Sequence, residues 1–296
     1  MAYSNSIALV KKFLPRLDEV YKYASKSAIL DSDGSLFREG VNANEIAVAK
    51  ISMDGQADYS RNAGFVDGAV TLSWETKQYN YDRGRMFQID SMDNEETIGI
   101  AFGRLASEYI RTKVTPEMDA VRFAKYAGTA NIGSATGTLS TGADVISALR
   151  TATSEMDDEE VPMEDRYLFI TSALNGAVED LDTTKSREVM SRFSSVVIVP
   201  QTRFYTKVTL YDGTTGGQTD GGYVRHADGK NINFMVISKS AILQTVKHTV
   251  NKIITPEQNQ NADAWKFGFR AYALNDMYDN KKKGVYVHHV SANPSV

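Results

Sequence analysis

The segment between Gly68 and Gly128 constrains the fold most, because it joins two elements that seldom adjoin in an enzyme. Residues 70–90 (VTLSWETKQYNYDRGRMFQID) alternate apolar and polar side chains on both sides of a turn signal at Gly84, which predicts a long polar β-hairpin. A long helix is predicted directly after it, from residue 94 to about 127, with Gly128 as its C-terminal stop. A two-stranded hairpin is marginally stable alone in water. We therefore expect an arm that projects from a domain and is supported by a neighbouring surface.

The predicted helix has a recognisable start and one apolar face. Asp93 is expected to be the N-cap, and Glu96 completes a capping box. Leu105 lies at the centre of the predicted buried stripe, which comprises Ile98, Ala101, Phe102, Leu105, Tyr109 and Ile110. Thr115-Pro116 indicates either a kink or the start of a second helix. A continuous helix over 94–127 would be about 50 Å long, which is the length of a domain spine.

Composition excludes several classes of protein. The chain has 296 residues, of which 42% are apolar and 24% are charged, and its formal net charge is −4. A protein that binds DNA through its phosphates normally shows a basic face, which these values do not suggest. The absence of cysteine removes disulfides, thiolate metal sites and cysteine nucleophiles. No apolar run approaches the roughly 20 residues that cross a bilayer, and Lys11 and Lys12 interrupt any signal-peptide core, so we expect no membrane association.

The N-terminal region, residues 1–40, is predicted to be an arm. Apolar residues recur at helical spacing between Val10 and Ala24, and this helix is expected to end before the turn-rich residues 31–34. The basic excess is small, so the amphipathic helix is expected to dock on protein rather than on a membrane. Residues 45–52 alternate as a β-strand.

Mixed α/β structure is predicted further along the chain. We expect helices over 144–154 and 172–181, and strands over 167–171, 195–199, 205–210 and 233–237. The glycine-rich residues 211–222 are too long for a tight turn, which predicts an exposed, mobile tip. Near the C-terminus, residues 265–270 and 285–290 are expected to be two strands joined by a turn at 279–284.

The residues that usually perform catalysis are not grouped in this sequence. His288 and His289 would point to opposite faces of a strand and could not chelate one metal. The glycine-rich residues 133–142 lack the Gly-Lys-Ser/Thr ending of a phosphate loop, and the acidic run 157–160 is interpreted as a solvated helix end. We therefore expect no enzyme, no cofactor and no metal site. A soluble hydrolase is the alternative from another class, using scattered carboxylates such as Asp54, Asp58 and Asp67.

Four segments together resemble the major capsid proteins of tailed bacteriophages with the Hong Kong 97 fold. They are the N-terminal arm, the extended hairpin (the E-loop of that family), the helix with TPEMDAVRFAKY at 115–126, and the segment from WKFGFR at 265–270 to residue 288. The resemblance extends over nearly the whole chain and rests on the pattern and order of the segments. It implies an α+β fold with an N-terminal arm (1–40), a peripheral domain split between 41–128 and 250–296, an axial domain (129–249), an E-loop hairpin at 68–92 and a spine helix at 94–127.

The resemblance implies a structural subunit that self-assembles into hexamers and pentamers. These would form an icosahedral shell around double-stranded phage DNA, without sequence-specific binding to it. The E-loop would contact a neighbouring subunit through Trp74, Lys77, Tyr79, Tyr81, Arg83, Arg85 and Phe87, and a loop at the axial tip would present Asp212, Gly216, Gly217 and Asp220. Some members of the family link an E-loop lysine to an asparagine of another subunit. No matching asparagine or activating glutamate motif is found here, so we do not extend that chemistry to this chain.

The resemblance also implies partners and a location. The partners are other copies of the chain, a portal protein and, in some members, a decoration protein. The arm begins almost at Met1 without a long charged pro-region, so either a separate scaffolding protein guides assembly or a prodomain was removed, and the initiating methionine favours the scaffolding protein. The implied location is the virion capsid, assembled in the cytoplasm of a host bacterium. A cellular encapsulating shell of the same fold, which loads a cargo enzyme instead of DNA, is the alternative that the sequence does not separate from a phage capsid.

Overall fold

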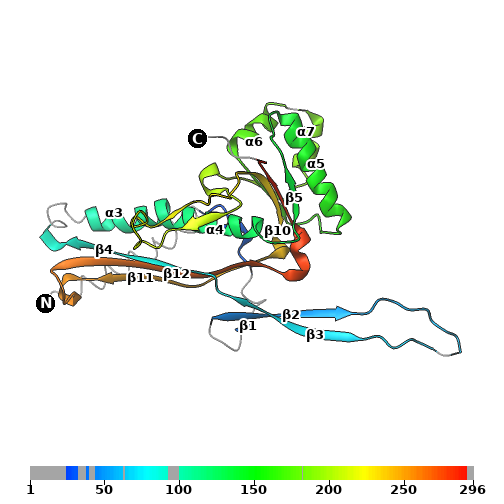
Figure 1. Cartoon of the computed structure of the whole chain (residues 1–296), viewed down its shortest axis with the longest axis horizontal. Helices are drawn as coiled ribbons and strands as arrows, with labels where there is room; N and C mark the ends of the chain where they lie inside the picture. Colours follow the sequence, from blue (N-terminus) through cyan, green and yellow to red (C-terminus); the bar gives the residue numbers. More distant parts are fainter. Residues whose placement is uncertain are drawn as a thin grey trace.

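The computed structural model describes residues 25–32, 38–39, 44–62, 64–92, 100–181 and 183–291. The predicted N-terminal helix between Val10 and Ala24 and the predicted capping box of Asp93 and Glu96 lie outside these residues. The molecule is elongated (Figure 1). A long sheet covered by a helix forms one end, a five-stranded sheet covered by shorter helices forms the other, and a β-hairpin projects beyond it as an arm.

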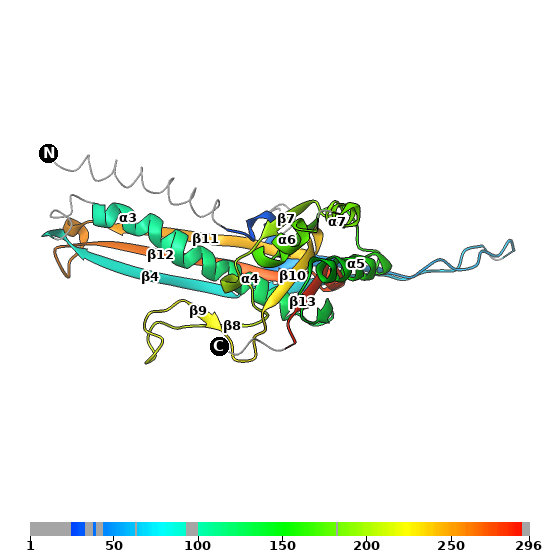
Figure 2. The same ribbon diagram turned by 90° about the horizontal axis from the view of Figure 1, so that it is seen from above.

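The long sheet consists of β4 (Tyr81–Asp90), β12 (Ala264–Met277) and β11 (Ile242–Ile254), which are antiparallel with β12 in the centre. One helix runs along this sheet (Figure 2) and is formed by α3 (Ile100–Tyr109), a π-helical segment (Ile110–Val114) and α4 (Thr115–Ala127). We call these three segments the spine helix. The predicted long helix is thus confirmed over residues 100–127.

The contact between the spine helix and the long sheet is apolar. On the helix, Ala106, Ile110, Val114 and Met118 are buried, and they form one cluster with the buried β12 residues Phe267, Phe269, Ala271 and Ala273. Ile110 exposes 1% of its surface, whereas Leu105 is only partly buried against the same cluster. The prediction that Leu105 is the centre of the buried stripe is therefore wrong, because the fully buried positions follow Ala106, Ile110 and Val114 instead.

Pro116 explains the π-helical segment. Proline has no N–H, and in a regular α-helix its ring clashes with the carbonyl four residues earlier. Widening the preceding turn removes that clash, and the Thr115 N–H donates instead to the Ile110 carbonyl, five residues back. Thr115 itself has helical dihedral angles (φ −62°, ψ −47°), so the helix neither stops nor restarts at this position. Thr115 is therefore not an N-cap, so the predicted start of a second helix at this residue is wrong, whereas a kink at Thr115-Pro116 stays a prediction.

The predicted hairpin over 70–90 is also wrong, because its two halves belong to different sheets. Strand β3 (Val70–Gln78) pairs with β2 (Glu45–Met53), and β4 pairs with β12 over ten residues. The alternating apolar residues of β4, among them Tyr81 and Phe87, are buried or partly buried under the spine helix. Gly84 lies within the ladder opposite Arg270, where a Cβ atom would come within 2.7 Å of the Phe269 carbonyl oxygen. Gly84 therefore allows two paired strands to approach closely, and it does not form a turn.

The five-stranded sheet has the order β5 (Gly133–Thr136), β13 (Val285–His289), β10 (Ile232–Ser238), β6 (Arg166–Ile170) and β7 (Ser195–Ile198). One of its faces packs on Phe123 and Tyr126 of α4. The other packs on α5 (Gly142–Asp158), α6 (Ser172–Glu179) and α7 (Thr184–Met190). Residues 133–136 form a strand, and Thr141 begins α5 in a capping box with Asp144, which agrees with a linker and not with a phosphate loop.

The last strand, β13, does not return along residues 265–270 as predicted. It lies between β5 and β10 of the five-stranded sheet, after a 3-10 segment at Asp279–Gly284. Four of its five residues are buried, which is typical of a central strand with both faces covered. Strand β13 thus pairs with strands from residues 129–249, and the predicted domain division stays a prediction.

The acidic run at the end of α5 is not simply solvated. Asp157 forms an ion pair of 2.7 Å with Arg166, whose side chain is 2% exposed, and Glu159 pairs with Lys283 at 2.6 Å. The Arg166 guanidinium also donates hydrogen bonds to the carbonyl oxygens of Val161 and Pro162. A buried guanidinium requires such partners, so the acidic run balances a charge in the fold.

A buried histidine in this sheet gives an expected pH dependence. His288 is 5% exposed, and its Nδ1 lies 3.0 Å from the Asn233 amide nitrogen, a donor that fits a neutral ring. Burial lowers the pKa of His288, and the proximity of His289 lowers it further. As the pH falls below about 6.5, the unfolded chain therefore binds a proton first, and stability decreases until the pH reaches the lower folded-state pKa. We expect urea unfolding to show a lower midpoint at pH 5.5 than at pH 8. The difference should shrink in His288→Gln and persist in the exposed control His248→Gln.

Candidate functional site

The projecting arm has two chemically different faces. Residues directly opposite in an antiparallel pair share a face of the sheet, and the pairs Ala49–Trp74, Ile51–Leu72 and Met53–Val70 therefore lie on one side. The pairs between them lie on the other side. We call the first side the apolar face (Ala49, Ile51, Met53, Val70, Leu72 and Trp74) and the second the polar face (Lys50, Ser52, Thr71 and Ser73).

The base of the arm is fixed to the body of the subunit. The contact is made by residues on the same side of the hairpin as the polar face. Ile46 is 3% exposed and packs with Leu243 and Leu274, and Val48 is partly buried against them. A two-residue strand, β1 (Arg38–Glu39), also pairs with β2 at the base. On this side of the hairpin, the residues that contact the body are therefore apolar, and the residues beyond the body are polar.

The apolar face is exposed to solvent. Its five large side chains, Ile51, Met53, Val70, Leu72 and Trp74, have exposed fractions between 54% and 72%. The tip beyond them adds Tyr59, Phe65 and Val66, which are 60% to 88% exposed. Figures 1 and 2 both show that the arm extends away from both sheets, so the described part of the subunit does not cover this surface. An exposed apolar surface of this kind is typical of a protein–protein contact.

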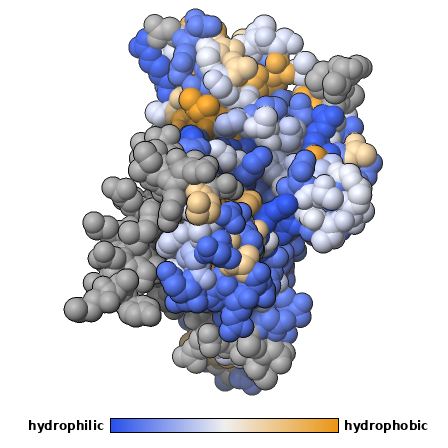
Figure 3. Space-filling model, turned by 90° about the vertical axis from the view of Figure 1, so that its left-hand side faces the viewer, coloured by the Kyte–Doolittle hydropathy of each residue, from blue (hydrophilic) through white to orange (hydrophobic). Residues whose placement is uncertain are grey.

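The opposite end of the molecule has a different surface. Figure 3 shows the end that carries α3, where hydrophilic residues predominate and hydrophobic residues are scattered in small groups. In the described part of the chain outside the arm, the exposed large apolar residues are 38% to 62% exposed and are spread over several elements; they are Met86, Met92, Met163, Ile198 and Val224. The concentration of exposed apolar side chains is therefore a property of the arm.

Only two of the seven predicted contact residues lie on the arm. Trp74 belongs to the apolar face, and Lys77 lies at the base of β3. The Lys77 ammonium is 2.6 Å from Glu75 and 3.2 Å from Asp279. Burial lowers the pKa of Lys77, but the hydrogen bonds to Glu75 and Asp279 and the charge of Asp276 outweigh it and raise the pKa overall. Lys77 is therefore held in ion pairs at the base of the arm.

The other five predicted residues belong to the body of the subunit. Tyr79 lies between the two sheets and stacks on Tyr272. Tyr81, Arg83, Arg85 and Phe87 lie on the side of β4 that faces the spine helix. The Arg83 guanidinium forms an ion pair with Glu117 at 2.8 Å and donates to the Tyr211 and Gly222 carbonyl oxygens. These contacts are made within one chain, and a contact with a neighbour through these residues stays a prediction.

The glycine-rich loop 211–222 lies against β4. It connects β8 (Val208–Leu210) to β9 (Tyr223–Arg225). Arg85 donates hydrogen bonds of 2.9 and 3.0 Å to the carbonyl oxygens of Asp220 and Thr219. The carboxylate of Asp212 accepts hydrogen bonds from Thr215 and Thr214, and these bonds lower its pKa. The loop is thus bound to β4 and mostly exposed, and its predicted mobility stays a prediction.

The loop contains the four residues assigned to an axial tip. Asp212, Gly216, Gly217 and Asp220 are exposed or partly exposed, which leaves them accessible to a neighbour. Figure 2 shows the loop beside β4, away from α5, α6 and α7, so its position differs from that of a tip on the axial segment. Their contact with another subunit remains a prediction.

No described group of side chains has the composition of a catalytic or metal site. Among the described residues there is no cluster of three histidine or carboxylate side chains that could hold a metal. A groove of about 730 Å³ lies between the spine helix, β4 and loop 211–222, but its central charges are the paired Arg83 and Glu117. Asp54, Asp58 and Asp67, which the hydrolase alternative requires, are exposed on the outer part of the arm. Within the described ranges, no helix is both long and apolar enough to cross a membrane.

Comparison with known proteins identifies the fold. No family model and no curated protein sequence matches the chain. Among solved structures, a chain of Gordonia phage Cozz aligns over 91% of this chain and 87% of its own length, with a TM-score of 0.59 and 10% identity. The capsid of cyanophage P-SCSP1u aligns over 87% and 86%, with a TM-score of 0.56 and 13% identity. A virus-like particle from Pyrococcus furiosus aligns over 93% and 99%, with a TM-score of 0.57 and 8% identity.

These similarities cover most of each chain. Identities of 8% to 13% show the fold and carry no information on individual residues. The chain has the α+β, Hong Kong 97-type fold of tailed-phage capsid proteins.

Proposed function

We propose that the chain is the major capsid protein of a tailed phage. It assembles into hexamers and pentamers, which form an icosahedral shell around double-stranded DNA. The observation that supports this most strongly is the similarity of the whole chain to phage capsid structures at TM-scores above 0.5. The exposed apolar face of the arm supports it independently, because that surface requires a partner.

The partner of the apolar face is a second copy of the chain. The arm extends away from its own subunit, so its outer part reaches another copy without folding back. A contact between two different surfaces of identical subunits is heterologous, and such contacts close into rings when the rotation between subunits permits it. Many contacts of modest strength then stabilise a closed shell together. The contact residues in this proposal are Ile51, Met53, Val70, Leu72 and Trp74.

Other partners and the location follow from the same proposal. A separate scaffolding protein guides assembly in the cytoplasm of the host bacterium, a portal protein occupies one vertex, and a decoration protein binds in those phages that have one. The mature location is the virion capsid. Co-expression with neighbouring genes that encode candidate scaffolding and portal proteins would test these partners directly.

A cargo-loading shell of the same fold is the second candidate. The similarity to the virus-like particle from Pyrococcus furiosus, which aligns over 99% of its own length, favours keeping it. The two candidates differ in what the particle contains. Particles purified from the native source should contain phage DNA if the first candidate is right and a folded cargo protein if the second is right.

Size measurement on the purified chain tests the shell function itself. Light scattering after size-exclusion chromatography should reveal closed particles, alone or with the scaffolding protein. A hydrolase of this length should instead form a monomer or small oligomer. Only small oligomers under both conditions would contradict the proposed function.

We expect the isolated subunit to bind duplex DNA weakly. The net charge of −4 gives little attraction to phosphates, and a wall that bound DNA tightly would hinder its release. A fluorescence titration should give a dissociation constant of about 10⁻⁴ M or weaker near physiological salt, independent of sequence. Sub-micromolar binding under the same conditions would contradict a shell that encloses DNA without binding it tightly, and would favour a nucleic-acid-binding protein.

A further inference from the structure

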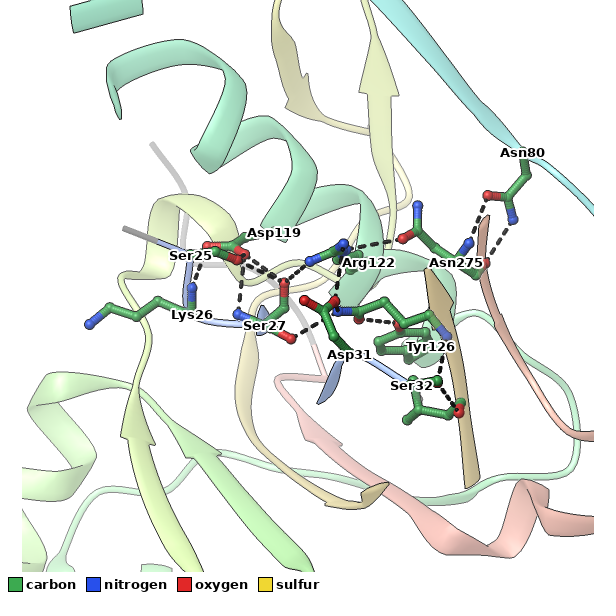
Figure 4. Close-up of polar contacts among 12 residues, drawn as sticks. Ser25, Lys26, Ser27, Asp31, Ser32, Asn80, Asp119, Arg122, Tyr126 and Asn275 are labelled. Atoms are coloured by element: carbon green, nitrogen blue, oxygen red, sulfur yellow. Dashed lines mark hydrogen bonds and ion pairs between the residues drawn. The ribbon is translucent and has the colours of Figure 1, made fainter. Parts of the chain in front are cut away.

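Residues 25–32 are attached to the spine helix by a buried carboxylate (Figure 4). Asp119 of α4 has no exposed surface. Its carboxylate accepts hydrogen bonds from the Ser25 and Ser27 hydroxyls, both at 2.7 Å, and from the backbone N–H groups of Lys26 and Ser27 at 2.9 and 3.2 Å. Three consecutive residues near the N-terminus therefore supply four donors to one side chain.

The remaining partner of Asp119 is a single cation. Arg203, in the 3-10 segment Gln201–Arg203, donates to the same carboxylate at 3.2 Å. A buried carboxylate is strongly unfavourable unless it is both paired and hydrogen-bonded. Without residues 25–27, Asp119 would keep one partner of five, so the local structure of α4 depends on the N-terminal segment.

A second set of contacts extends the attachment to the long sheet. Arg122, which is 1% exposed, donates to the Ser27 hydroxyl at 2.9 Å and to Asn275 of β12 at 3.0 Å. The amide nitrogen of Gln244 in β11 donates to the Ser27 carbonyl at 3.0 Å and to the Asp31 carboxylate at 2.5 Å. Ser27 is thus bonded to the helix and to the sheet at once.

Apolar packing and backbone bonds complete the attachment. Leu30 is fully buried in the cluster that includes Phe123 and Tyr126 of α4. The Ser32 N–H donates to the Gln244 carbonyl at 2.9 Å, and the Gln244 N–H donates to the Ser32 hydroxyl at 3.0 Å. The segment is therefore held along its length by α4 on one side and by β11 on the other.

We infer that residues 25–32 are a permanent anchor, formed within each subunit, that fixes where the N-terminal segment leaves the spine helix. The anchor therefore stays in place when subunits associate or separate. Asp119, Arg122 and Gln244 are the positioning residues. The anchor belongs to the folded subunit, so this inference does not depend on the proposed shell function.

Hydrogen–deuterium exchange of the full chain, read by mass spectrometry, tests the anchor. In the wild type, peptides containing the amides of Lys26, Ser27 and Leu30 should exchange as slowly as peptides from α4, at both high and low protein concentration. Ser27→Ala removes the hydrogen bonds that the Ser27 hydroxyl forms with the charged groups of Asp119 and Arg122. Exchange of the 25–32 peptides should therefore become about tenfold faster or more. Asp119→Ala should increase it by roughly a hundredfold or prevent folding.

Asp212→Ala is the matched control, because it also removes an aspartate that accepts several hydrogen bonds, but in loop 211–222. It should leave exchange in residues 25–32 unchanged. Three results would each overturn the inference. They are fast exchange of 25–32 in the wild type beside a protected α4, unchanged exchange in Ser27→Ala, and protection that appears only at concentrations where subunits associate.

Discussion

The double variant Leu72→Lys/Trp74→Lys is expected to give a folded subunit that forms no closed shells. Both side chains are more than half exposed in the isolated subunit, so lysine there should change its stability little. At a contact with a second copy, each lysine would place a charge in an apolar surface, which costs several kcal/mol unless the charge is paired. That cost recurs at every copy of the contact. Circular dichroism should show an unchanged fold, and light scattering should show no particles.

The matched control is Thr71→Lys/Ser73→Lys, which adds the same charges to the same strand on the polar face. This control should still form particles. Normal particles from Leu72→Lys/Trp74→Lys would show that the apolar face is not a contact. Equal loss of assembly in both variants would show that added charge on the arm is harmful regardless of face.

The second large effect is expected for Ile110→Asp, which should abolish soluble expression. Ile110 is 1% exposed, at the point where the spine helix crosses β12, and nothing basic is buried beside it in the described apolar cluster. An unpaired carboxylate there costs several kcal/mol, while a whole domain is stable by about 5–15 kcal/mol. Soluble yield and thermal unfolding would measure the effect.

Leu105→Asp should be milder, because Leu105 is only partly buried. Thr112→Asp, on the exposed side of the π-helical segment, serves as the control and should melt close to the wild type. A soluble Ile110→Asp variant that melts like the wild type would mean that the packing face of the spine helix is assigned wrongly.

The sequence predicts the elements of this fold better than their pairing. The spine helix follows from its apolar period and from Gly128, which are local signals. Strand pairing is not local, and the alternation in Val70–Trp74 is compatible with a partner on either side. The turn signal near Gly84 therefore pointed to the wrong partner, because glycine also serves where two strands approach closely. Pattern alone does not distinguish these two uses.

The chemistry of the candidate site was predictable only in part. The arm was expected to contact a neighbour, but the apolar face depends on the register of β2 with β3, which the sequence does not reveal. The anchor was not predicted at all. Asp119 and Arg122 look like ordinary polar positions of a helix, and their partners lie more than 90 residues away at Ser25 and Ser27. Only the folded chain brings these groups together.

Electron cryomicroscopy of particles assembled from the purified chain tests the proposed shell function and the role of the arm together. We expect closed icosahedral shells in which the β2–β3 arm of each subunit lies on another copy, with Ile51, Leu72 and Trp74 buried at that contact. Closed shells in which the apolar face remains exposed to solvent would contradict the role of the arm. Failure to form shells, with or without the scaffolding protein, would contradict the proposed shell function.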